Sequence, residues 1–189
     1  MARWQPNASD RLALAALELF AERGYENTTV IDIARRAGLT KSTFFRHFAD
    51  KREVLFGAGT MNELIEGAIA AAPATATPLE AVAHALGALG ETAFAPARRA
   101  FVARRRAVIA ANPELREREA LKGLGLIRSM TDALSRRGVF DLTAHVAAEL
   151  GMLAWTIAYE RWCDPASDED FSELARRALS EVQAATTSC

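Results

Sequence analysis

The stretch VIDIARRAGLTKSTFFRHF, residues 30–48, contains two short amphipathic segments separated by a glycine. In the first segment, apolar residues recur at i, i+3, i+4 and i+7 from Val30, which is the spacing of one helical face. Gly38 ends that segment, and Phe44 and Phe48 then form the i, i+4 apolar face of a second helix. Two short helices joined by a tight glycine turn predict a helix-turn-helix.

Threonines precede both helices and can cap them. Thr29 lies three residues before Asp32, which approximates a capping box, and Thr40 stands two residues beyond Gly38. The second helix is therefore expected to begin almost immediately after the turn. Its outer face can lie in the major groove of DNA.

The charge of this region supports a nucleic-acid interface. Between Thr29 and Arg52 there are six basic and two acidic residues, a net charge of +4, whereas the whole chain of 189 residues carries −1. A local positive face on a slightly acidic chain is typical of a surface that binds phosphates.

The run TTVIDIARRAGLTKSTFFRHFADKREVL, preceded by ALELFAERGYENTT, resembles the N-terminal domain of the tetracycline-repressor (TetR) family over about residues 8–56. The resemblance implies a sequence-specific transcriptional regulator that binds double-stranded operator DNA, and we expect a repressor. Two positions depart from the family pattern: Phe45 replaces the usual tyrosine, and Ser42 replaces a frequent glycine. For Lys51, a phosphate contact is weighed against a plain solvated charge. The predicted DNA contacts are Thr29, Arg36, Thr40, Lys41, Ser42, Thr43, Phe45, Arg46, His47 and Lys51.

The whole chain is expected to be all-α. Residues 1–9 are predicted to be a flexible tail, residues 10–49 a three-helix DNA-binding domain, and residues 50–189 a C-terminal helical ligand-binding and dimerisation domain. Asp50 is expected to cap a long helix over residues 50–72 that links the domains. Further helices are predicted over residues 79–94, 96–111, 113–137, 142–163 and 171–182.

The helix predicted over residues 142–163 is apolar on more than one side, which indicates burial on more than one side. One side can pack on its own domain and another on a second copy, and the resemblance implies the same homodimer. The alternative is packing entirely within one chain. The predicted interface residues are Ala147, Gly151, Ala154, Ala158, Phe171, Leu174, Ala178, Leu179 and Val182.

The resemblance also implies a cavity for an unidentified small-molecule effector. Bound effector would tilt the helix over residues 50–72, change the separation of the two reading helices and release DNA. The run RRAVIAANPELRERE is similar to stretches of relatives that sense fatty-acyl or acyl-CoA-like molecules. Aromatics at helical spacing are also typical of a plain core, and the arginines of a solvated face. The candidate lining residues are Met61, Leu64, His84, Phe94, Phe101, Arg104, Met130, Trp155 and Tyr159.

Two other classes of function were weighed. An enzyme is disfavoured because the three histidines are scattered and the chain has neither a zinc-binding pattern nor a G-x-S-x-G motif, so we expect no catalytic residue, metal or cofactor. A purely structural helical bundle is disfavoured by the basic, hydroxyl-rich second helix. Without an apolar span or leader, and with only Cys163 and Cys189, we expect a cytoplasmic protein with no membrane partner.

Overall fold

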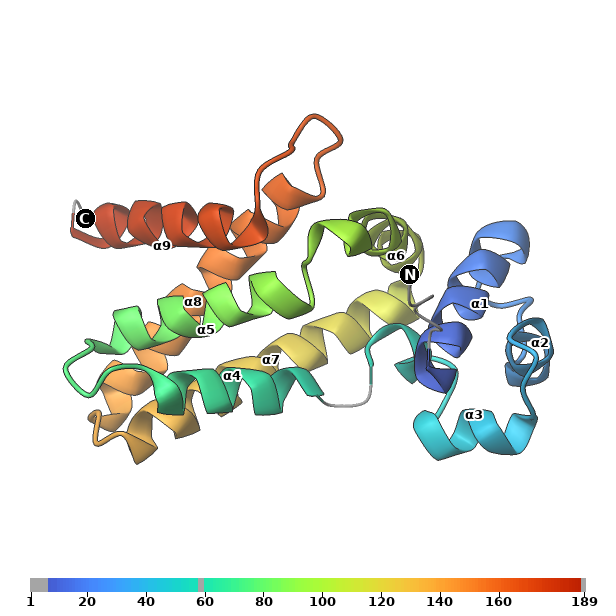
Figure 1. Ribbon diagram of the computed structural model, residues 1–189, viewed down its shortest axis with the longest axis horizontal. Helices are drawn as coiled ribbons and strands as arrows, with labels where there is room; N and C mark the ends of the chain where they lie inside the picture. The colour runs from blue at the N-terminus through green and yellow to red at the C-terminus, as the bar shows by residue number, and fades with distance from the viewer. Residues whose placement is uncertain (1–6, 58–59, 188–189) are drawn as a thin grey trace, which may run out of the picture. The chain divides into compact units, whose positions relative to one another are not determined.

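The computed structural model describes residues 7–57 and 60–187, which contain helices and no strand (Figure 1). This confirms the predicted all-α class. The α-helices are α1 Ala8–Arg23, α2 Val30–Arg36, α3 Lys41–His47, α4 Thr60–Ala71, α5 Pro78–Thr92, α6 Arg99–Ala111, α7 Pro113–Arg136, α8 Asp141–Trp162 and α9 Phe171–Thr187, and the two 3₁₀ helices are η1 Glu53–Leu55 and η2 Pro96–Arg98.

The caps of the first three helices show why they begin where they do. The predicted capping box of α2 is confirmed, because the Asp32 amide donates to Thr29 Oγ1 and the Thr29 amide donates to Asp32 Oδ2, both at 3.1 Å. Thr40 caps α3 without a capping box; the Thr43 amide donates to Thr40 Oγ1 at 3.1 Å. Asn7 caps α1, so this helix begins before the predicted start and the expected tail is wrong for residues 8 and 9. The remainder of that tail, residues 1–6, lies outside the described residues.

The helix predicted over residues 50–72 is broken, and that expectation was wrong. The Asp50 carboxylate caps only η1, where it accepts hydrogen bonds from the amides of Arg52 and Glu53 at 2.8 and 3.1 Å. Gly57 follows with φ of +72°, a left-handed conformation that ends the helical path. The next helix, α4, begins at Thr60.

The chain divides into two compact units, and the first is discontinuous in sequence. It contains the described residues up to 57 together with residues 103–120, whereas the second contains residues 60–102 and 121–187. Within the first unit, Arg105 Nε donates to the Leu55 carbonyl at 2.6 Å and its guanidinium lies 4.9 Å from the centre of the Phe56 ring. The first unit therefore has other boundaries than the single division predicted at residue 50. The prediction missed the returning segment, residues 103–120, because no local sequence pattern links it to residues 50–57.

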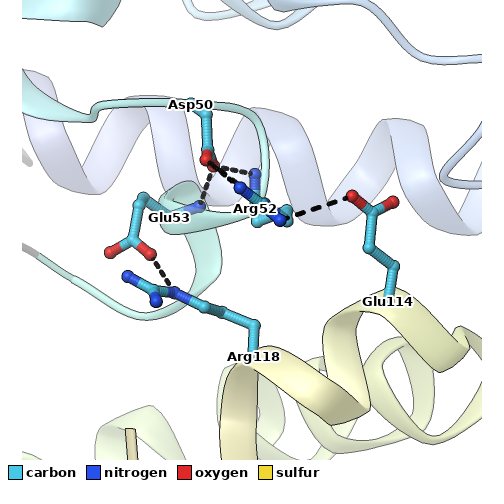
Figure 2. A network of polar contacts seen from close by, with 5 residues as sticks. All are labelled: Asp50, Arg52, Glu53, Glu114 and Arg118. Atoms are coloured by element: carbon cyan, nitrogen blue, oxygen red, sulfur yellow. Dashed lines mark hydrogen bonds and ion pairs between the residues drawn. The ribbon is translucent and has the colours of Figure 1, made fainter. Parts of the chain in front are cut away.

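Ion pairs join the same returning segment to the residues after α3 (Figure 2). Arg118 on α7 pairs with Glu53, and Arg52 lies between Asp50 at 2.8 Å and Glu114 at 3.8 Å. The hydrogen bond from Arg52 holds the pKa of the Asp50 carboxyl below its ordinary value. Residues 52–55 are thus held by side chains 50 to 65 positions away in sequence.

The core of the second unit forms where α5 packs against α8 and α9 (Figure 1). A methyl group added at Gly151 would lie 2.4 Å from Val82 Cγ1, and one added at Gly90 would lie 2.0 Å from Ser172 Oγ. Both glycines therefore permit close helix approach within this one chain. Arg137 fastens the end of α4 by donating to the carbonyls of residues 69, 72 and 73 at 3.0, 2.8 and 2.6 Å.

The face of α8 and α9 predicted to meet a second copy is instead buried in this core. Because α8 is apolar on nearly every side, its pattern does not show which side faces inward. The large apolar side chains that α8 exposes are Leu142, Val146 and Leu153, at 65, 47 and 50%. The nine predicted interface residues that the chain itself buries are Ala147, Gly151, Ala154, Ala158, Phe171, Leu174, Ala178, Leu179 and Val182.

Over residues 7–57 and 60–187, no helix is both long enough and apolar enough to cross a bilayer.

Candidate nucleic-acid interface

The turn between α2 and α3 is fixed by backbone contacts and by a side chain from α1. Gly38 has φ of +65°, and the Leu39 amide donates to the Ala34 carbonyl at 2.8 Å. Arg11 Nη2 reaches from α1 to the Ala37 carbonyl at 2.5 Å. Because Ile33 and Phe44 are also fully buried, α3 is held in one orientation against the rest of the unit.

The outward face of α3 is formed by Lys41, Ser42, Phe45 and Arg46, all of which are exposed. Their positions, i, i+1, i+4 and i+5, share one side of the helix, while Phe44 and Phe48 are buried on the other. Base edges and phosphates that approach α3 would therefore meet a hydroxyl, an apolar ring and two cations.

Three other predicted DNA contacts on or beside α3, Thr40, Thr43 and His47, already make contacts within the chain. The hydroxyls of Thr40 and Thr43 bond to each other at 2.9 Å, and Thr40 Oγ1 also caps the helix. His47 is half-buried and its ring centre lies 6.3 Å from that of Phe48. These side chains set the helix in place as well as bordering its outward face.

The cations of the predicted interface fall into two groups. Lys41 and Arg46 take part in no ion pair within the described part of the chain. Arg36 pairs with Glu22 at 2.8 Å and Glu18 at 3.3 Å, which raises the pKa of Arg36 and lowers that of Glu22. A DNA phosphate that binds Arg36 must therefore compete with the carboxylates of Glu18 and Glu22. At Lys41 and Arg46 a phosphate meets no such competition from the described residues.

Lys51 also has a structural role that its sequence position did not indicate. Its ammonium donates to the Tyr25 carbonyl at 2.8 Å and lies 3.9 Å from the centre of the Tyr25 ring. As phosphate contacts, Lys51 and Arg36 stay predictions. Binding DNA would require each of them to share or break the contacts it makes here.

A shallow cleft of about 200 Å³ between α1 and α2 contains two cations that the sequence pattern did not single out. Arg23 and Arg35 are exposed there, and their helical positions alone gave no reason to select them over other surface arginines. The cleft extends the positive surface beyond α3. It is lined by Leu19, Arg23, Asp32, Arg35 and Arg36.

The structure brings together part of the predicted effector site in the second unit. The Phe94 ring centre lies 6.0 Å from that of Trp155 and 5.8 Å from that of Tyr159. Met130 is fully buried, and the predicted residues Met61, Leu64 and Phe101 are half-buried against the same core.

His84 and Arg104, the two residues with ionisable nitrogen groups among the predicted lining residues, do not lie in this core. His84 is exposed, and its Nδ1 lies 3.0 Å from the Ala68 carbonyl oxygen on α4, so it links two helices at the surface. Arg104 is exposed and belongs to the first unit. As effector contacts, both residues stay predictions.

The geometry of residues 7–57 agrees with a known family. Residues 13–58 match the family model described as bacterial regulatory proteins, tetR family. Residues 13–58 are therefore similar to the DNA-binding part of that family. The HTH-type transcriptional regulator TcmR of Streptomyces glaucescens is 43% identical over 81 residues, which cover 42% of this chain and 36% of TcmR. The match thus spans little more than a third of that relative.

Solved structures of TetR-family proteins share the fold over almost the whole chain. A transcriptional regulator of Mesorhizobium loti has a TM-score of 0.55 at 22% identity, covering 95% of this chain and 96% of its own. FadR of Thermus thermophilus, solved in complex with lauroyl-CoA, has a TM-score of 0.53 at 24% identity, covering 93% of each chain.

Proposed function

We propose that this chain is a sequence-specific transcriptional regulator of the repressor kind, which reads operator DNA with α3. The observation that carries the proposal is the outward face of α3, where Lys41 and Arg46 flank the Ser42 hydroxyl and the Phe45 ring and pair with no carboxylate of residues 7–57 and 60–187. Arg46 has the donor geometry for a guanine edge, and Lys41 that for a phosphate.

A second copy of the chain is needed to place two such helices in successive major grooves, roughly 34–36 Å apart. We assign the contact between copies to the exposed side of α8. Leu142, Val146 and Leu153 follow one another there at i, i+4 and i+11, with Leu150 and Ile157 half-buried at the edge of the same stripe. A row of apolar side chains this exposed is typical of a protein interface.

DNA reading is tested on an operator found by genome-wide mapping of bound sites. Arg46→Ala is expected to weaken binding by about 1–3 kcal/mol and to relax base preference at one position of each half-site, as measured by fluorescence anisotropy. Lys41→Ala is expected to weaken binding to all sequences and to lower the slope of log affinity against log salt by about one per half-site. Arg176→Ala, a change at an exposed arginine on α9, serves as the control. Unaltered affinity in both α3 variants would reject the assignment.

The interface is tested by sedimentation of Leu153→Glu, which places a charge in the proposed contact. We expect the wild-type chain to sediment as a dimer and the variant as a folded monomer. Leu14→Glu provides a matched control, because Leu14 is 43% exposed and lies on α1, which belongs to the other unit. A Leu153→Glu dimer as tight as wild type would show that another surface joins the copies.

We also propose that a small hydrophobic effector, fatty-acyl or acyl-CoA-like, releases the operator. The support is the aromatic group of Phe94, Trp155 and Tyr159 in the second unit, together with the solved complex of Thermus thermophilus FadR with lauroyl-CoA. Lauroyl-CoA is expected to weaken operator binding by about 5- to 150-fold, with free coenzyme A as the control. Operator affinity unchanged at saturating lauroyl-CoA would reject an acyl effector and leave DNA reading intact.

A further inference from the structure

Phe45 is an exposed aromatic side chain in the middle of the outward face of α3. It is 48% exposed, whereas Phe44 and Phe48, the other two phenylalanines of this segment, are 0 and 3% exposed. A half-exposed phenylalanine stabilises the free fold little. Its position between Lys41 and Arg46 therefore calls for a role in what α3 binds.

The ring is held in place by its neighbours. The Phe44 ring meets it edge-on, with centres 5.5 Å apart and an angle of 78° between planes. The Lys41 ammonium lies 5.9 Å from the centre of the Phe45 ring. An apolar surface is thus presented in a fixed position, next to a cation that can bind a phosphate.

We propose that Phe45 reads the C5-methyl group of a pyrimidine in the major groove, in thymine or in 5-methylcytosine. The inference rests on the proposed function, since it requires that α3 enter that groove. A phenylalanine has no hydroxyl with which to bond a phosphate, so its contact with DNA is apolar. The pyrimidine C5-methyl is the apolar group on a major-groove base edge, which makes it the complementary partner.

The experiment removes the methyl group from DNA and the ring from the protein. Operator duplexes carry deoxyuridine in place of thymidine, one symmetric pair of positions at a time, and a second series carries 5-methylcytosine in place of cytosine. Loss of the methyl that Phe45 contacts is expected to lower wild-type affinity about fourfold per half-site, from about 0.8 kcal/mol per buried methyl, and thus about 16-fold for the symmetric pair. If the contact is to 5-methylcytosine, the second series instead raises affinity by the same factor.

Variants of the protein decide whether Phe45 is responsible. Phe45→Ala is expected to bind methylated and unmethylated duplexes equally, while Ile31→Ala, which truncates a side chain 49% exposed on α2, keeps the wild-type difference. Circular dichroism melting confirms that both variants fold. The inference is overturned if Phe45→Ala still distinguishes duplexes with and without the methyl group. It is also overturned if the affinity of the wild type changes in neither series; both outcomes leave DNA reading by α3 intact. A wild type that binds no operator rejects the proposed function itself.

Discussion

Replacing Gly151 by alanine tests directly whether this residue faces the chain's own core or a second copy. The added methyl would lie 2.4 Å from Val82 Cγ1, about 1 Å inside ordinary contact. Val82 is fully buried, and a valine in a helix is confined almost entirely to one rotamer, so it cannot turn aside. The strain must therefore move α5 and α8 apart.

The magnitude follows from two opposing terms. Glycine in a helix interior costs about 1 kcal/mol relative to alanine, so the substitution gains that amount. Overpacking by one methyl typically costs about 1–3 kcal/mol, and a clash this close belongs at the upper end. We expect Gly151→Ala to lower the free energy of unfolding by about 2 kcal/mol, equivalent to about 4–8 °C in melting temperature for a chain of this size.

Urea unfolding at two protein concentrations measures this change. Val82→Ala should partly rescue Gly151→Ala, with a coupling of about 0.5–3 kcal/mol, because it removes the clashing carbon. Gly67→Ala is the control: Gly67 lies in α4 with nothing within 4 Å of the added carbon, so it should stabilise by about 1 kcal/mol. A Gly151→Ala protein as stable as Gly67→Ala, or one that only weakens dimerisation, would refute the packing of α8 on α5.

Three further predictions concern stability. Arg137→Ala removes the donors that bind the end of α4 and is expected to cost about 2–3 kcal/mol in urea unfolding, whereas the neighbouring Arg136→Ala, at a side chain 60% exposed, should cost under about 0.5. Thr77→Ala removes the cap of α5 and should cost about 1 kcal/mol by the same assay. Because the pKa of Asp50 is lowered, its stabilisation is present above about pH 4 and lost as pH falls through the lowered pKa, so acid unfolding should depend less on pH in Asp50→Asn.

Local signals in the sequence were sufficient for much of the first unit. The caps at Thr29 and Thr40 and the turn at Gly38 each depend on residues within four positions, and all three are found. The start of α7 at Pro113 follows the same rule, since proline favours the first helical position. Caps and turns of this kind are determined by residues close to them in sequence, so a local pattern predicts them.

Contacts between distant residues were not predictable in this way. Arg36 was selected for DNA without its partners Glu18 and Glu22, which lie a helix earlier on α1. Lys51 reaches back 26 positions to Tyr25. In each case the sequence shows the cation and the residues next to it in the chain. The partner of the cation depends on how the helices pack, which the sequence pattern does not give.

The prediction of which side of α8 faces a second copy failed for a different reason. An amphipathic helix has one apolar side, and its period identifies that side, as on α9, where the apolar stripe from Phe171 to Val182 is buried. On α8 the small residues and the large aliphatic residues form separate apolar stripes. The small stripe faces the core because α5 approaches it closely at Gly151, a constraint that lies in α5.

The discontinuity of the first unit limits how such regulators can exchange parts. A gene fusion that transplanted only the residues up to 57 would leave behind Arg105 and Arg118, and with them the partners of the Leu55 carbonyl and of Glu53. Recombination that yields a new pairing of operator and effector must therefore either carry residues 103–120 along, cutting two helices, or find a recipient whose α6 and α7 already fit. New operator preferences should arise more readily by point substitution on α3 than by recombination of whole DNA-binding units.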